Sequence, residues 1–273
     1  MGNLFSFFNY NKPGPGVPKD EPPKPRIVVF FQIYFDKLWE LIKLNLMFLF
    51  FNIPALILVY FLFTLFFSSM QSSLAEDETF LSLVLFTSFS SIFLSIPVIT
   101  TGPSQAGFTF VLRNYSRREH VFLMSDFKEN IGKNFKQALV ISLIDFLVVL
   151  FMLVDIYICL NLGINSFVVN LIVYVLIFVL ILFLMMHIYI YPMLVTFSLS
   201  VKHIYKNALI FAIIKFLPNL GILLLCFILS ALPFLLYLPA GLILFPLITL
   251  STVGFITNFY AYPTLEKYMI KKE

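Results

Sequence analysis

Long apolar blocks alternate with short polar segments along most of this 273-residue chain. A bilayer has a hydrocarbon core of about 30 Å, which about 20 helical residues can cross. Six blocks have roughly this length: residues 45–67, 80–98, 138–159, 167–191, 217–236 and 239–259. The pattern therefore predicts an all-α, polytopic membrane protein with about six transmembrane helices.

The segment before the first block is amphipathic. In residues 27–44, apolar side chains such as Phe31 and Phe35 recur at steps of three and four, and charged residues occupy the other positions. Trp39 is suited to the headgroup level of a bilayer. We therefore predict an interfacial helix that lies along the membrane surface. Residues 1–26, which precede it, are rich in Pro and Gly and are expected to form an extended tail.

Residues 99–137 form the longest polar segment between two apolar blocks. A Gly-Pro turn opens it, and two amphipathic helices on the inner membrane face are expected to follow, the second capped by Ser125. We predict that this segment docks a partner protein or anionic lipid. The candidate docking residues are Gly102, Pro103, Gly107, Arg113, Arg117, Arg118, Asp126 and Lys128.

The positions of the cations predict the orientation. Six of the 18 Lys and Arg precede the first block, six lie between the second and third, three lie in residues 202–215, and three in the tail. In a six-span topology every group falls on one side of the membrane. Because cytoplasmic loops carry an excess of Lys and Arg, both termini are predicted to be cytoplasmic. Residues 192–216 then form a cytoplasmic loop with a short helix at 208–216, and residues 260–273 form a cytoplasmic tail.

Composition excludes a soluble globular domain. Hydrophobic residues make up 60% of the chain and charged residues 12%, whereas soluble domains carry about 25% charged residues. Lys outnumbers Arg by 14 to 4, so a nucleic-acid surface is not expected. Cys159 and Cys226 fall in separate apolar blocks and are expected to be inert, membrane-buried side chains.

A few polar residues lie inside the apolar blocks, where burial is costly and function is the default hypothesis. Asp145 and His187 have similar predicted depths, so they can form a pair. Such a pair serves either as a bond between helices or as a proton relay or cation site. Asn45 and Asn52 lie seven residues apart on one helical face, where they are expected to bond to a neighbouring helix or, alternatively, to contact a substrate.

No catalytic or cofactor motif is present. The chain lacks HExxH, a Gly-rich phosphate loop, GxSxG and a paired Cys motif. We therefore expect no enzyme activity, no cofactor and no metal site. The apolar blocks also offer few of the Asn, Gln, Glu and Trp side chains that a sugar permease uses along its path.

Several stretches resemble the YesL-like family of bacterial membrane proteins. They are GPSQAGFTFVLRNYSRREH followed by SDFKENIGKNFKQ, the earlier KLWELIKLNLMFLFFNIP, and MMHIYIYPMLVTFSLSVKHIYKNAL. The resemblance covers most of residues 14–269. It implies a bacterial cytoplasmic membrane location and an occurrence beside carbohydrate-uptake and polysaccharide-utilisation systems. The family supplies no established catalytic or ligand residues.

Two functions remain open at this point. The first is an accessory or regulatory membrane component associated with carbohydrate uptake or utilisation, which docks a transport-system protein through residues 102–137. The alternative is a small-solute or ion transporter or channel. It would use a polar path along Asp145, His187, Asn45 and Asn52.

Overall fold

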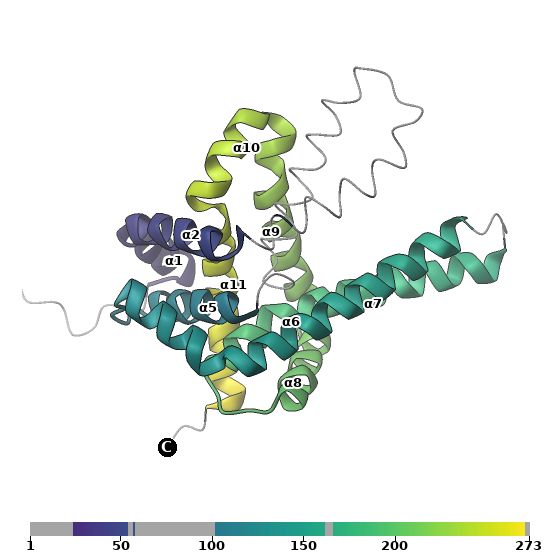
Figure 1. Cartoon of the computed structure of the whole chain (residues 1–273), viewed down its shortest axis with the longest axis horizontal. Coiled ribbons are helices and arrows are strands. Elements are labelled where there is room, and N and C mark those ends of the chain that lie inside the picture. The colour runs from purple at the N-terminus through teal and green to yellow at the C-terminus, as the bar shows by residue number, and fades with distance from the viewer. Residues whose placement is uncertain (1–23, 54–56, 58–101, 162–165, 271–273) are drawn as a thin grey trace, which may run out of the picture.

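The computed structural model describes residues 24–53, 57, 102–161 and 166–270, and the described residues form helices and no strand. The helices are α1 (Arg26–Asp36), α2 (Leu38–Phe51), α5 (Gly102–Ser116), α6 (Leu123–Asn161), α7 (Phe167–Leu194), α8 (Val201–Ile214), α9 (Phe216–Leu236), α10 (Leu238–Leu244), the π-helix η3 (Phe245–Thr249) and α11 (Leu250–Met269) (Figure 1). The predicted tail, the block at 80–98 and most of the block at 45–67 lie outside the described residues.

Four helices of the described chain are long and apolar enough to cross a membrane. They are Leu123–Ile156, Phe167–Leu194, Phe216–Leu236 and Leu238–Met269. Each contains most or all of one block predicted from the sequence, so an all-helical, membrane-embedded protein is confirmed. Six spans and cytoplasmic termini remain predictions.

No helix end marks the predicted boundary near residue 137 between the amphipathic segment and the apolar block. Helix α6 runs unbroken for 39 residues, from Leu123 to Asn161. The apolar face that begins with Phe127 continues directly into the block, and no proline interrupts it. The predicted Ser125 cap is wrong: the Asp126 carboxylate accepts the backbone N–H of Phe122 at 2.8 Å, just before the first turn.

Helix α5 is enclosed by other helices and does not expose a continuous polar face. Eleven of its 15 residues are buried, and it packs against α2, α6, α7 and α11. Two glycines permit this close packing. A Cβ on Gly102 would lie 1.9 Å from the Ala138 carbonyl oxygen, and a Cβ on Gly107 would lie 2.6 Å from that of Phe127. Small residues of this kind allow helix backbones to touch in membrane proteins.

The predicted interfacial helix is two helices, because α1 ends at Asp36 and α2 begins at Leu38. One face of α1 packs on α11 through the Phe30 ring, which meets Phe255 and Phe259. The predicted membrane-facing residues Phe31 and Phe35 are exposed. The side chains on this face are therefore available to lipid.

Two further boundaries differ from the sequence prediction. The short helix predicted at 208–216 is α8, which starts earlier, at Val201. The block at 239–259 is divided among α10, the π-helix η3 and the first half of α11. Pro246 lies in the π-helix, where its missing N–H removes one backbone donor.

Three side-chain bonds join neighbouring helices at one end of the molecule, which we call the basic end. Arg113 of α5 bonds to Val195 at the end of α7, Gln137 of α6 to Leu199 before α8, and Lys215 between α8 and α9 to Thr264 of α11. Away from this end, α6 and α7 lie side by side and extend beyond the other helices (Figure 1). We call residues 147–161 and 167–182 the α6–α7 arm.

Candidate functional site

Asp145 of α6 and His187 of α7 form a fully enclosed pair. The imidazole Nε2 lies 2.9 Å from the carboxylate Oδ1, and both side chains are 0% exposed. The prediction that they meet is confirmed. Their role is a separate question, since a buried pair of this kind serves either to join helices or to handle protons.

The surroundings fix the tautomer of His187. Its Nδ1 lies 2.8 Å from the Phe183 carbonyl oxygen, and a carbonyl can only accept, so Nδ1 carries a hydrogen. Its Nε2 contacts Asp145 Oδ1 at 2.9 Å but has no hydrogen-bond partner among the described residues.

Tyr205 of α8 is a third member of the site and was not among the residues predicted from the sequence. Its hydroxyl donates to Asp145 Oδ1 at 2.6 Å, and burial, followed by the nearby Asp145, raises the pKa of Tyr205 far above its usual value. The phenol therefore remains a donor, and the site joins α6, α7 and α8. A helical wheel offered a signal, because Tyr205 shares a face with the buried Ala208 and Ala212.

One oxygen of this site is unsatisfied. Asp145 Oδ2 is buried and has no hydrogen-bond partner among the described residues. Buried polar atoms are nearly always paired, so this oxygen and His187 Nε2 are the unusual atoms of the site.

The two asparagines do not join Asp145 and His187. Asn45 Nδ2 donates to the carbonyl oxygens of Phe245 at 3.0 Å and Pro246 at 2.7 Å, and its Oδ1 accepts the N–H of Ser251 at 2.8 Å. It thereby satisfies backbone groups around the π-helix, and the prediction that it bonds to a neighbouring helix is confirmed. Asn52 donates to the Phe48 carbonyl of its own helix at 2.7 Å, and its Oδ1 accepts from the Ser104 hydroxyl of the neighbouring α5 at 3.5 Å.

No predicted polar residue lines the interior cavity between α7, α9 and α11. This cavity has a volume of about 10 Å³, and six of its seven lining residues are apolar or Cys, including Ile188, Cys226 and Val253; the seventh is Thr257. A space of that size holds about one water molecule. It provides no continuation for a path from Asp145.

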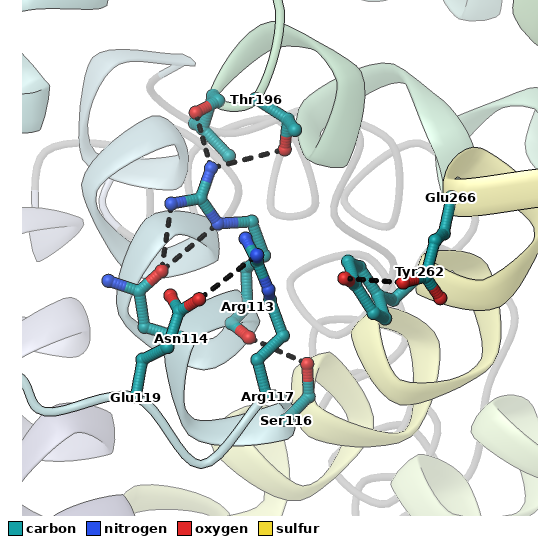
Figure 2. A network of polar contacts seen from close by, with 9 residues as sticks. Arg113, Asn114, Ser116, Arg117, Glu119, Thr196, Tyr262 and Glu266 are labelled. Atoms are coloured by element: carbon teal, nitrogen blue, oxygen red, sulfur yellow. Dashed lines mark hydrogen bonds and ion pairs between the residues drawn. The ribbon is translucent and has the colours of Figure 1, made fainter. Parts of the chain in front are cut away.

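The predicted docking residues separate into interior and surface groups. Gly102 and Gly107 lie at the contact of α5 with α6. The Arg113 side chain bonds within the protein. Its Nη1 donates to the Val195 carbonyl at 2.7 Å, and its Nε and Nη2 donate to Asn114 Oδ1 at 3.0 and 2.8 Å. Figure 2 shows Arg113 between α5 and the end of α7. Burial, followed by Arg117, lowers the pKa of Arg113.

Arg117 is held by neighbours in the same network (Figure 2). Its guanidinium forms an ion pair with Glu119 at 3.0 Å and lies 4.8 Å from the ring centroid of Tyr262 in α11. Pro103 lies in the first turn of α5, and Asp126 caps α6. None of these residues presents an unoccupied cation.

Arg118 and Lys128 are the exposed cations of the predicted docking residues. Arg118 has a φ of 59°, the left-handed conformation that usually ends a helix with glycine. The N–H of Arg118 bonds to Tyr115 O at 3.0 Å, and that of Glu119 to Asn114 O at 2.9 Å. These bonds form a Schellman motif in which arginine occupies the glycine position.

Residues 38–156 match the model of a family described as a protein of unknown function, DUF624. The matched region contains Asp145 and all the predicted docking residues, but neither His187 nor Tyr205. No curated protein and no solved structure matches the chain. The comparisons therefore assign no chemistry to these residues.

Proposed function

We propose that this protein is an accessory or regulatory membrane component that docks a partner protein at the basic end. One observation carries the proposal. The intramembrane polar side chains bond to neighbouring helices, whereas Arg118 and Lys128 remain exposed. The link to carbohydrate uptake or utilisation rests on the resemblance to YesL-like proteins.

The enclosure of Asp145 and His187 supports an accessory role over a conduit. A transported solute must reach its site, and intramembrane charges on a transport path face a water-filled cavity or the substrate. Here both side chains are 0% exposed, and Asn45 bonds to helices on another part of the molecule. The four residues of the predicted path therefore form separate helix contacts.

The surface around Arg118 and Lys128 supports a docking role. The segment between them, which includes the first turn of α6, exposes Phe122 and Met124 by more than half of their surface. Exposed apolar side chains next to cations are typical of a protein interface with an apolar centre and a charged rim. The partner that fits is a protein with an acidic rim around an apolar pocket.

Photo-crosslinking in living cells tests this proposal. A photoreactive amino acid at Met124 should capture a transport-system or carbohydrate-utilisation protein, and Lys128→Glu should reduce that product about tenfold through like-charge repulsion. The same amino acid at the exposed Tyr174 of the α6–α7 arm is the control. Capture of the same proteins from both positions would contradict the proposal.

The unsatisfied Asp145 Oδ2 favours the alternative, a small-solute or ion transporter. A buried carboxylate oxygen without a partner, in contact with a histidine, is a feature of proton-linked sites. Flux into vesicles that contain the purified full chain separates the two functions. The accessory role predicts no flux of protons, cations or sugars, whereas flux that disappears in Asp145→Asn would establish transport.

A further inference from the structure

A surface groove at the basic end lies outside both sites described above. It runs between residues 132–137 of α6 and the connection from α7 to α8, and has a volume of about 760 Å³. Gln137 Nε2 donates to the Leu199 carbonyl at 3.1 Å and fixes the two walls relative to each other. The sequence does not predict this groove, because its walls are more than 50 residues apart in the chain.

The groove combines an apolar floor with cations. Leu194, Phe197 and Leu199 contribute apolar surface, and Lys133 and Lys136 line the α6 wall. Lys133 forms an ion pair with Glu129 one turn earlier, whereas Lys136 forms no ion pair within the described chain. Its ammonium group is therefore available to an anion.

An apolar stripe continues from Lys136 along α6. Val140, Leu143, Leu147 and Leu150 follow at helical spacing and are 47%, 59%, 40% and 43% exposed. The 14 residues from Lys136 to Leu150 correspond to about 21 Å of helix, which exceeds the roughly 15 Å of one leaflet's hydrocarbon. The stripe is therefore long enough to lie against an acyl chain.

We propose that this groove binds an anionic phospholipid. The phosphate would lie against Lys133 and Lys136, the glycerol region over Phe197 and Leu199, and an acyl chain along the α6 stripe. An acidic peptide fits less well, because the stripe enters the depth of the bilayer, where a peptide backbone finds no hydrogen-bond partners. This site does not depend on the proposed partner docking, which uses Arg118 and Lys128.

Native mass spectrometry of the full chain tests the lipid site. The protein is released from nanodiscs that contain equal amounts of phosphatidylglycerol and phosphatidylcholine, and the retained lipid is counted. Lys133→Gln/Lys136→Gln should reduce retained phosphatidylglycerol roughly 10- to 30-fold, as expected when two lysines near a headgroup are lost. Lys206→Gln/Lys267→Gln is the matched control, because it removes two exposed lysines of the same end from outside the groove.

A phosphatidylglycerol with a photoreactive acyl chain provides a second readout. Crosslinks should fall between Val140 and Leu150 and should disappear in the Lys133→Gln/Lys136→Gln variant. Equal retention in both double variants, or crosslinks mainly on the exposed face of α9, would overturn the proposal. Displacement of the lipid by soluble glycerol phosphate at the same concentration would also overturn it, since the groove would then select the phosphate group and not the lipid.

Discussion

Helix α5 and the α6–α7 arm follow opposite rules of burial. Helix α5 contains two glycines, several polar residues and an arginine, yet 11 of its 15 residues are buried. The most apolar window of α7 is only 11% buried, and that of α6 is 22% buried. In a soluble protein the apolar helices would form the interior. Here the small and polar residues of α5 lie in the interior.

The difference follows from the solvent. Lipid is as apolar as leucine, so burying Leu and Val against protein gains little, whereas close packing and hydrogen bonds between helices gain more. Gly102 and Gly107 bring α5 into contact with the α6 backbone, and Arg113 and Asn45 satisfy carbonyl groups of neighbouring helices. Close backbone contacts and interhelical hydrogen bonds, which lipid cannot replace, hold α5 and its neighbouring helices together. The apolar side chains of the α6–α7 arm face lipid instead.

The largest expected effect on the free energy of unfolding distinguishes Asp145 from Asp155, two aspartates of α6. Asp145→Ala leaves His187 and Tyr205 without their shared acceptor, and removing one member of a buried pair costs about 3–5 kcal/mol. Asp155→Ala, on the exposed arm, should change the free energy of unfolding by less than about 0.5 kcal/mol. Unfolding of the purified protein in mixed micelles by increasing SDS measures both.

The double variant Asp145→Ala/His187→Ala sharpens this result. Since the two side chains touch, the double variant should lose at least about 1 kcal/mol less than the sum of the two single losses. Strict additivity would show that the pair contributes no mutual stabilisation.

The next effect compares two glycines of the α5–α6 region. Gly102→Ala places a methyl group against the Ala138 carbonyl, and overpacking of this kind costs about 1–3 kcal/mol. At Gly132 no atom lies within 4 Å of a new Cβ, so Gly132→Ala should stabilise α6 by about 0.5–1 kcal/mol. The same unfolding assay applies, and similar losses at both positions would contradict the close contact of α5 with α6.

The smallest effect concerns two neighbouring arginines at the end of α5. Arg118→Gly removes a side chain from a left-handed position and should raise stability by about 0.5 kcal/mol, although it should weaken partner docking. Arg117→Gly should lower stability instead, because Arg117 has the Glu119 ion pair and the Tyr262 contact. A loss of stability in Arg118→Gly would show that its 3.3 Å bond to Gln32 outweighs the backbone strain.

The sequence predicts the lipid-facing part of this fold well and the interior poorly. Apolar length is sufficient to find α6, α7 and α9, because crossing a bilayer requires a long apolar helix. The burial of helix α5 was not predicted, because its arginines and polar residues are typical of a surface, and the backbone contacts at Gly102 and Gly107 exist only after folding. The Asp145–His187 pair could be predicted from similar depth. Tyr205 could be placed on one helical face with Ala208 and Ala212, but its bond to Asp145 could not be predicted, since the two residues are 60 positions apart in the sequence.

The most direct test is electron paramagnetic resonance of nitroxide labels on the full chain in bilayers. Labels at Leu147, Leu150 and Val175 of the arm should be accessible to molecular oxygen, which partitions into lipid, and inaccessible to a polar nickel chelate. Labels at Lys128 and Lys206 of the basic end should be accessible to the nickel chelate and less accessible to oxygen. Chelate accessibility along the arm would contradict the account, because the exposed apolar surface would then face water instead of lipid.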